Sequence, residues 1–533
     1  MQDGFRSALE EWAQVVGPGR VLSRQDAEHR YGGSTIGVRS DITGAVRPTS
    51  AGEVQAIVSI AHRHSIPLYP VSTGRNWGYG TANPVTAACV LDLSEMQRIV
   101  DVDAELGLVT VEPGVTQGML HEFLVERGLP FMVPVTGAGP TCSVLGNALE
   151  RGFGITPHCD HFGAVMSVEA VLGDGRTYRG PFAEMGVEGI DRAHKWGIGP
   201  YVDGLFAQSG FGVVTRMTIA LARVPEDFCA FFFGARSDSA LEELVTSIRQ
   251  VMRSTGGSAG FVNLMNAQRM LAMLEPFPED TAVGGVIPDH HVARMAKRNG
   301  VMRWNGIGAI YGSKEVVRAA RRTIRRLLRA HVDRLVFVRR NSLKWFRYAE
   351  RFLPRTPRER VARMVHALEQ SMDIMQGIPR EVALPLAYWR SGRRPPPGEY
   401  MNPARDGCGL MWYAPLVVMK PALVRDYVET LTRICHEHGM NPLITLTTLS
   451  DRCFDSTVPL LFDRSDAAAC SRAEDCYQAL FEAGLGKGFV PYRVSTRAMS
   501  RLTRSGEFWR TVADLKGAVD PSNIVAPGRY ARL

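Results

Sequence analysis

Residues 70–80 read PVSTGRNWGYG and directly follow the apolar segment SIPLYPV at 65–71. The apolar segment predicts a buried strand, and the glycines and hydroxyl side chains predict a flexible polar loop after it. Glycine permits positive φ and close backbone approach, and a row of backbone N–H groups binds oxyanions. The loop is therefore a candidate cradle for a diphosphate, although a plain tight turn explains it equally well in isolation. It matches neither GxGxxG nor a P-loop, so it indicates neither the usual dinucleotide fold nor an NTPase.

Helix and strand patterns alternate on both sides of this loop. Helical periodicity behind the cap-like pair Thr49 and Ser50 predicts a helix that ends near residue 65. Strand patterns occupy residues 88–94 and 99–114, and a second helical pattern covers 116–128. A further turn and strand are expected over 205–222. This part of the chain has α/β organisation.

Composition restricts the class of protein. The 533 residues predict two to four domains, and 45% hydrophobic residues are ordinary for a globular protein. No apolar run is long enough to span a membrane, and the N-terminus lacks the apolar core of a signal peptide. The nine cysteines are scattered without a CxxC pair, so we expect reduced thiols, a cytoplasmic location and no metal site.

The net charge of +8 is partly concentrated in residues 314–340. Apolar residues recur there at helical spacing between arginines, which predicts a solvated amphipathic helix. A surface for nucleic acid or acidic lipid is the alternative, but no aromatic side chains alternate with the arginines. We expect no nucleic-acid partner.

The loop is the first of five motifs that follow one another along the chain: PVSTGRNWGYG (70–80), SVLGNALERGFGITPHCDHF (143–162), KWGIGPYVDGLFAQSGFGVVTRM (195–217), YRVSTR (492–497) and DPSNIVAPGR (520–529). Together they resemble the vanillyl-alcohol oxidase and p-cresol methylhydroxylase family of flavoproteins. The resemblance is densest over 44–222 and 490–529 and thin over 226–380. It implies an α+β fold with a two-part FAD-binding domain of the p-cresol methylhydroxylase type. The two parts would be residues 1–225 and 490–533, and 226–489 would form an α+β cap domain built on an antiparallel sheet.

The resemblance also implies which residues hold FAD. The loop would bind the pyrophosphate through Pro70, Val71, Ser72, Thr73, Gly74, Arg75, Asn76 and Trp77. The other side of the flavin would be lined by Ser143, Gly146, Asn147, Arg151, Gly152 and Gly154. Val213 and Val214 would lie near the adenine or the ring, and Arg529 near the N1–C2 carbonyl edge, where a cation stabilises the charge of reduced flavin.

In phenol-oxidising members of the family, two tyrosines and an arginine bind the phenolic oxygen, and Tyr79, Tyr492 and Arg493 match them here. A cation and two hydroxyl donors lower the pKa of a phenol and favour phenolate, which eases hydride loss at the benzylic carbon. The alternative is a packing role for Tyr79 and a strand-edge role for the other two residues.

Two acids of the family pattern are missing at the aligned positions. Residues 133–143 contain no acid, so Val135, Thr136 or Ala138 replaces one, and Thr445 or Leu446 replaces the other. A reaction that needs a protein base is therefore in doubt. Oxidative decarboxylation is an alternative because departing carbon dioxide replaces proton removal. Counter-charge for the substrate carboxylate is then expected from the 391–407 loop and its neighbour, through Arg390, Arg393, Arg394 and Arg405.

Residues that tether the flavin in relatives are also replaced. Leu410 and Asn76 stand where relatives have histidine, and Gly139 stands where they have cysteine. We therefore expect FAD to bind noncovalently. A tyrosyl link through Tyr388 or Tyr400 stays open, with cap packing as the alternative for both tyrosines.

These features favour an FAD-dependent oxidase that acts on the side chain of a para-substituted phenol or related aryl compound, with molecular oxygen as acceptor. A cytochrome-coupled dehydrogenase is a second possibility, although the chain has no CxxCH haem motif. An oxidase of non-phenolic alcohols and a flavin-fold binding protein without activity are the remaining alternatives. A homodimer stays open.

Overall fold

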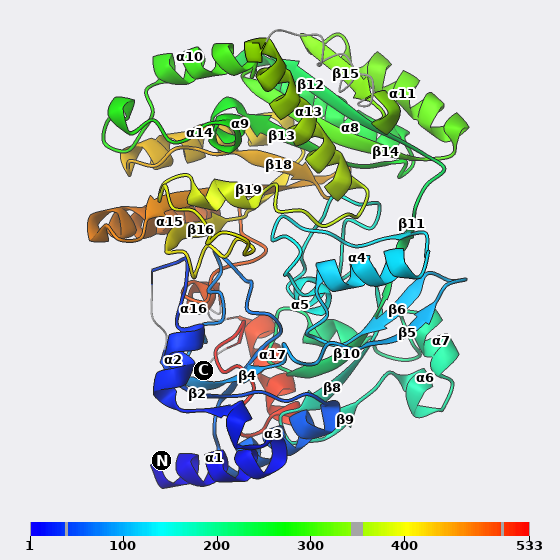
Figure 1. Ribbon diagram of the computed structural model, residues 1–533, viewed down its shortest axis with the longest axis vertical. Coiled ribbons are helices and arrows are strands. Elements are labelled where there is room, and N and C mark those ends of the chain that lie inside the picture. Colours follow the sequence, from blue (N-terminus) through cyan, green and yellow to red (C-terminus); the bar gives the residue numbers. More distant parts are fainter. Residues whose placement is uncertain (1, 38–40, 343–354, 503–505, 532–533) are drawn as a thin grey trace.

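The computed structural model describes residues 2–37, 41–342, 355–502 and 506–531. Three large β-sheets organise the described residues, two in the N-terminal half and a larger antiparallel one above them (Figure 1). A fourth, two-stranded sheet is formed by β7 (Phe131–Met132) and β11 (Ala222–Arg223). The α+β fold expected from the sequence is confirmed. The boundaries at residues 225 and 489 stay a prediction.

The first sheet has the strand order β1-β2-β4-β3, formed by Val21–Leu22, Ile42–Val46, Ala88–Asp92 and Leu68–Val71. Helix α3 (Ala51–His64) covers it, and the Ser50 side chain caps this helix by accepting the Glu53 N–H, as the sequence predicts. Helix α1 (Gln2–Val16) packs on α3 through Trp12, whose indole N–H donates to the Ile57 carbonyl at 3.1 Å. The predicted strand before the 70–80 loop is β3.

The second sheet has the order β5-β6-β10-β8-β9. Its strands are Ile99–Asp103, Leu108–Val111, Gly212–Ala220, Val165–Leu172 and Thr177–Tyr178. Helices α4 (Gln117–Glu126) and α5 (Val144–Leu149) contribute apolar side chains to the core beneath it. This sheet and α5 place residues 143–154 opposite the 70–80 loop.

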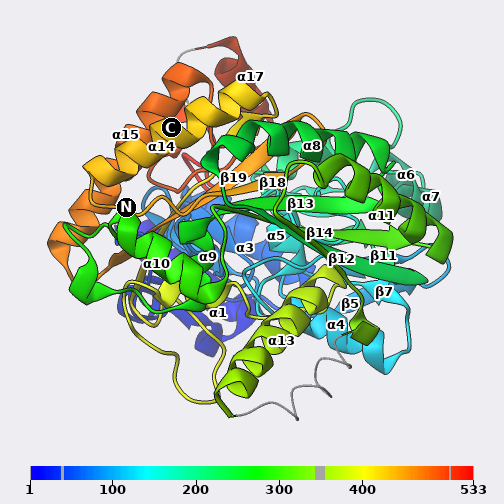
Figure 2. The same ribbon diagram turned by 90° about the horizontal axis from the view of Figure 1, so that it is seen from above.

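The third sheet, here called the cap sheet, has the order β15-β12-β14-β13-β18-β19-β16, with β17 paired to β19. Its strands are Arg334–Val338, Asp227–Ala235, Trp304–Gly312, Ala259–Asn266, Thr445–Thr448, Cys453–Asp463, Cys408–Tyr413 and Leu416–Val418. One face packs on α8 (Leu241–Ser254), α11 (Lys314–Leu328), α14 (Pro421–Glu437) and α15 (Ala467–Lys487) (Figure 2). The other face is turned toward the N-terminal half.

The predicted helix over 314–340 is only partly correct. Helix α11 ends at Leu328, and Arg334–Val338 forms the edge strand β15. The side chains of the segment RLVFV alternate between two faces with the period of a strand. Its pairing with β12 therefore replaces a continuation of the helix. Arg321 and Arg325 lie over the Phe337 ring at 5.1 and 5.4 Å, so part of the basic surface covers this strand.

The C-terminal segment returns to the first sheet (Figure 1). After α17 (Glu507–Val519), the Leu68 N–H donates to the Ile524 carbonyl and the Ala526 N–H donates to the Leu68 carbonyl, both at 2.7 Å. The segment therefore lies beside β3 and brings Arg529 to the loop that follows this strand.

Candidate active site

A cavity of about 530 Å³ lies between the N-terminal half and the cap sheet. Its walls come from the 70–81 loop, α5 and the following turn, β10, one face of the cap sheet, and residues 492–493 and 525–529. Segments from both ends and the middle of the chain meet there.

The 70–80 loop forms one wall, and its glycines have a specific purpose. Gly78 has φ of 77°, and its N–H donates to Thr35 Oγ1 at 2.8 Å. A Cβ at Gly78 would lie 2.2 Å from the Trp412 ring of the cap sheet. Only glycine allows both this backbone conformation and this close approach between loop and cap.

An adjoining wall is formed by α5 and the turn after it. Ser143 caps α5 by accepting the Gly146 N–H at 2.9 Å and donates to the Pro113 carbonyl at 2.7 Å. A Cβ at Gly146 would meet Ser72 Oγ at 2.2 Å, so α5 lies directly against the loop. Burial lowers the pKa of His161 to about 3, and its neutral ring bonds Asn147 through Nδ1.

Most residues predicted to hold a cofactor line this cavity. They are Pro70, Val71, Ser72, Thr73, Gly74, Arg75, Asn76, Trp77, Ser143, Gly146, Asn147, Gly152, Gly154, Val214 and Arg529.

Arg151 and Val213 do not line the cavity, so its lining gives no support to their predicted contacts with the cofactor. Arg151 follows α5 with φ of 51° and is exposed, while its neighbours Glu150 and Gly152 face inward. Val213 alternates with Val214 on β10, so it points to the other face and packs in the core with Ile57 and Leu68. A motif groups neighbouring residues, but the backbone turns their side chains in different directions.

Tyr79, Tyr492 and Arg493 come together at the cavity although Tyr79 lies far from the other two in sequence. The Arg493 guanidinium carbon lies 4.3 Å from the centre of the Tyr79 ring. Arg493 Nη2 donates to Asn76 Oδ1 at 2.5 Å, and the Phe153 and Tyr492 rings meet edge to face at 5.7 Å. The burial of both tyrosines raises the pKa of each hydroxyl above its usual value, so both are neutral donors.

Sequence reasoning missed a carboxyl group in this cluster. Asp455 on β19 lines the cavity, is 4% exposed, and its Oδ1 has no hydrogen-bond partner among the described residues. Burial raises the pKa of Asp455 to about 7, and the nearby Arg493 lowers it in part. Asp455 is therefore a carboxyl group of the site that the two aligned positions do not include. It lies on the strand next to β18, paired opposite Thr447.

Glu150 is a second missed acid. It accepts a hydrogen bond from Arg529 Nη2, and its Oε2 lies 3.2 Å from Arg493 Nε. Arg529 Nη1 also donates to Tyr69 Oη at 2.8 Å. Glu150 thus holds two cavity arginines, one from each C-terminal motif.

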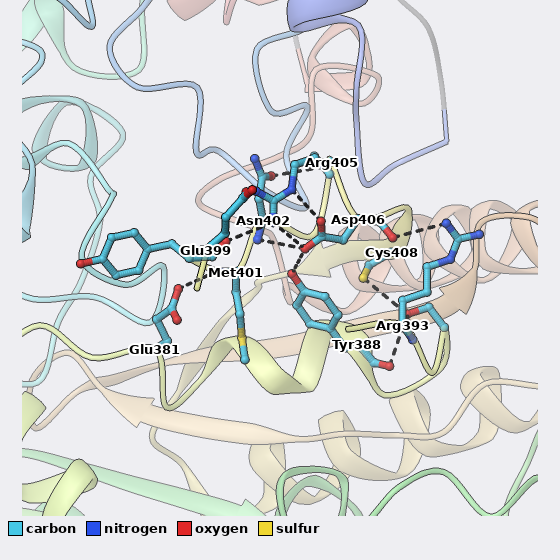
Figure 3. A network of polar contacts seen from close by, with 12 residues as sticks. Glu381, Tyr388, Arg393, Glu399, Met401, Asn402, Arg405, Asp406 and Cys408 are labelled. Carbon is cyan, nitrogen blue, oxygen red and sulfur yellow. Dashed lines mark hydrogen bonds and ion pairs between the residues drawn. The ribbon is translucent and has the colours of Figure 1, made fainter. Parts of the chain in front are cut away.

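The arginines of the 390–405 segment of the cap do not line the cavity, although Pro403 of the same segment does. Figure 3 shows Arg405 and Tyr388 gathered around Asp406, with Arg405 Nε 2.7 Å and Tyr388 Oη 2.5 Å from its carboxylate. Arg390 pairs with Glu279 and lies 3.7 Å from the centre of the Phe277 ring. Arg390, Arg393, Arg394 and Arg405 are all absent from the cavity lining, as are Tyr388, Tyr400 and Gly139, whereas Leu410 is part of it.

The described ranges meet neither the requirements of a metal site nor those of a membrane-spanning helix. They contain no group of three or more His, Cys, Asp or Glu side chains arranged to hold a metal ion. Within the same ranges, every helix is too short or too polar to cross a bilayer.

Comparison with known proteins gives concordant matches. Residues 42–180 match the FAD binding domain family. The chain is 37% identical to 1'-carboxy-chondrochloren decarboxylase of Chondromyces crocatus, over 98% of this chain and 96% of that protein. It is 28% identical to the 4-cresol dehydrogenase [hydroxylating] flavoprotein subunit of Pseudomonas putida, over 99% and 96%.

Solved structures agree with these sequence matches. A crystal structure of p-cresol methylhydroxylase with substrate bound superposes with a TM-score of 0.87 at 27% identity, covering 99% of this chain and 97% of that one. The 4-ethylphenol oxidase of Gulosibacter chungangensis superposes with a TM-score of 0.88, covering 100% and 98%, and at 24% identity it supports the fold alone.

Proposed function

Because the chain belongs to the vanillyl-alcohol oxidase and p-cresol methylhydroxylase family and is an FAD-dependent oxidoreductase, we propose that it oxidises the side chain of a para-substituted phenol. The observation that carries this proposal is the meeting of Tyr79, Tyr492 and Arg493 at one point of the cavity. A protein that only bound flavin would need none of these three side chains there.

The residues present suit FAD. The 70–77 loop offers backbone N–H groups and the Arg75 guanidinium, whose buried Nε has no partner among the described residues, and a diphosphate would pair with both. Gly146, Asn147 and Gly152 would contact the flavin, and Arg529 would hold the edge of the ring that becomes negative on reduction. When bound, FAD supplies the two-electron oxidation by accepting a hydride.

The protein residues prepare the phenol for that oxidation. Arg493 and the two tyrosine hydroxyls bind the phenolic oxygen, and the Asp455 carboxylate accepts its proton at Oδ1. The phenolate then pairs with Arg493, so the negative charge that the proton transfer creates on the phenolic oxygen is compensated.

We further propose that the oxidation is coupled to loss of carbon dioxide, as the name of the Chondromyces relative describes for that protein. Removal of a benzylic hydride leaves a quinone methide. When the neighbouring carbon carries a carboxylate, carbon dioxide departs and its bonding electron pair forms the alkene and restores the phenolate. Atoms and electrons balance without a base at the side chain, which fits Thr136 and Thr445 in place of acids.

A second candidate function is hydroxylation, in which water adds to the quinone methide, because the Pseudomonas relative is named as a hydroxylating enzyme. Carboxylated and uncarboxylated aryl substrates separate the two candidates in stopped-flow measurements of flavin reduction with carbon dioxide detection. Faster reduction by the plain alcohol, with no carbon dioxide from the acid, would favour hydroxylation.

Three finer properties are also proposals. Molecular oxygen is the proposed acceptor, which peroxide formation in air would test. The nine cysteines are free, which supports a reducing compartment such as the cytoplasm. A homodimer is proposed from the sequence, and light scattering on the purified holoenzyme would measure it.

The phenol site is tested by Arg493→Met. Loss of one charge-assisted contact to the developing phenolate should cost about 2–4 kcal/mol of transition-state stabilisation, or roughly 30- to 1000-fold in kcat/KM for a 4-substituted phenol. Arg497→Met is the matched control, because Arg497 is exposed and pairs with Glu474. Equal kcat/KM in wild type and Arg493→Met would remove Arg493 from the reaction.

A further inference from the structure

Arg269 is a buried cation in the cavity whose charge the described residues do not neutralise. It lies in α9 (Ala267–Leu274), where its backbone N–H donates to the helix-capping Asn266 side chain at 3.0 Å. Its side chain lines the cavity, is 8% exposed, and donates from Nε to Thr445 Oγ1 at 3.1 Å. Nη1 has no hydrogen-bond partner among the described residues, and no carboxylate there forms an ion pair with this arginine.

Such a group is costly in the free protein. Burial lowers the pKa of Arg269 to about 10, which still leaves it protonated at neutral pH. A buried charge with an unsatisfied donor reduces stability unless an anion completes its hydrogen bonds. A planar guanidinium with free N–H groups suits a carboxylate particularly well.

The other cavity cations have partners or a different position. Glu150 pairs with Arg493 and Arg529, and Arg75 belongs to the 70–77 loop and lies 5.8 Å from the Trp77 ring. The arginines of the cap segment 390–405, which the sequence suggests as partners for a substrate carboxylate, do not line the cavity. Arg269 is thus the free cation on the cap side among the described lining residues.

The register of the cap sheet separates Arg269 from the phenol cluster. Asp455 pairs opposite Thr447, whereas Thr445, which Arg269 contacts, pairs opposite Met265 and Thr457. Thr445 and Thr447 face the cavity two residues apart, or about 7 Å along the strand. A phenol held at Arg493 and Asp455 would therefore direct its side chain along the sheet toward Arg269.

From this arrangement we infer that Arg269 binds a carboxylate on the side chain of the substrate, at the end of the cavity away from the phenolic oxygen. The inference rests on the proposed function and names its substrate class: a para-substituted phenol with an anionic side chain. Ion pairing stabilises the carboxylate before carbon dioxide leaves, so Arg269 acts mainly on binding and orientation. Its loss should raise KM more than it lowers kcat.

Binding to the holoenzyme tests the inference without turnover. We choose 3-(4-hydroxyphenyl)propanoate and its neutral amide, titrated calorimetrically into enzyme whose flavin has been reduced with dithionite. Wild type should bind the acid more tightly than the amide. Arg269→Met should weaken acid binding by on the order of 100-fold and amide binding by no more than a few-fold. Arg269→Lys should recover part of the preference, and the exposed Arg394→Met should leave both affinities unchanged.

Thermal unfolding without ligand shows whether Arg269 has a structural role apart from binding. Because Arg269 is an uncompensated buried charge, Arg269→Met should not lower the melting temperature of the holoenzyme.

If Arg269→Met fails to fold, the acid-to-amide ratio of Arg269→Lys decides instead. A preference for the acid that survives in the variant, or equal weakening of both ligands, would overturn the inference. Arg493→Met should weaken the binding of both ligands. If it does so while Arg269→Met has no selective effect on the acid, the proposed function stands and the inference about Arg269 fails. Failure of wild type to bind either ligand would overturn both.

Discussion

Asp455 illustrates how one residue acquires chemistry from its surroundings. An aspartate on an exposed strand would be a solvated anion, but Asp455 is buried, has an oxygen without a partner, and lies near Arg493 and the hydroxyls of Tyr79 and Tyr492. Burial and the arginine act on it in opposite directions, and their balance gives a pKa of about 7. Such a group exchanges protons at physiological pH, which suits a base for a phenol.

Asp455→Asn should change how stability depends on pH. The folded pKa of about 7 lies above the unfolded value near 3.9, so between these values the folded protein binds a proton that the unfolded chain does not. The free energy of unfolding contributed by Asp455 therefore falls as pH rises from about 4 to 7. Melting of the holoenzyme from pH 5 to 8 should show wild type losing stability relative to Asp455→Asn.

Asp475→Asn provides the control for that series, because Asp475 is exposed on α15. If the melting temperatures of wild type and Asp455→Asn change in parallel with pH, the pKa of Asp455 is the same in the folded and unfolded states, which contradicts the prediction. In turnover, wild-type kcat/KM should rise with pH around 7, and Asp455→Asn should lack this rise.

At the scale of elements, the C-terminal return shows how a short segment is fixed beside a distant strand. Lys516 at the end of α17 reaches Asp520 and the carbonyl oxygens of Gly210 and Val525, and the Asp520 carboxylate accepts the N–H groups of Ile524 and Val525 at 3.0 and 2.8 Å. The ion pair is almost fully buried, with side-chain exposures of 7% and 0%. It orients the turn that presents Arg529 to the cavity.

Lys516→Met should destabilise the protein because it leaves the Asp520 charge buried without its cation. Breaking one side of a buried pair costs about 3–5 kcal/mol, measured as the free energy of unfolding in urea. Flavin should also be lost more readily during gel filtration, since residues 525–529 line the cavity.

Lys487→Met breaks an exposed pair with Asp426 and should cost about 1 kcal/mol or less. Similar urea midpoints for the two lysine variants would show that the C-terminal return does not depend on the buried pair.

At the scale of the whole molecule, the cavity lies where the N-terminal half and the cap sheet face each other. Residues 70–77 and 143–154 come from the N-terminal half, whereas Asp455, Thr445 and Arg269 come from the cap sheet and α9. FAD would contact the first group and the substrate both groups. Cofactor binding should therefore stabilise the folded state by mass action.

Acid precipitation of the purified protein should release FAD into a yellow supernatant. Leu410 and Asn76 offer no histidine for a tether, and neither Tyr388 nor Tyr400 lines the cavity. Protein stripped of flavin in concentrated bromide should melt at lower temperature and recover when FAD is added. A precipitate that stays fluorescent on a denaturing gel would show a covalent link and direct attention to Tyr388 and Tyr400.

Local patterns in the sequence were sufficient for much of the architecture. Capping residues, hydrophobic periods and glycine-rich turns act over a few neighbours, so α3, β3, α4 and the 70–80 loop follow from the residues themselves. Most residues that the motifs single out line the cavity, because glycines and hydroxyl side chains mark close backbone approach. Arg151 and Val213 lie outside the cavity lining, and a motif does not reveal which way each side chain points.

Only the tertiary structure decided the charges on the cap side of the site. Asp455 and Arg269 lie 186 positions apart and carry no distinctive local signal, and both reach the cavity through the register of β13, β18 and β19. A shift of one residue in that register would turn Asp455 and Thr445 toward the opposite face. Their exposure, their missing partners and the pKa of Asp455 depend on burial by segments remote in sequence, and burial of a charge is a property of the assembled fold.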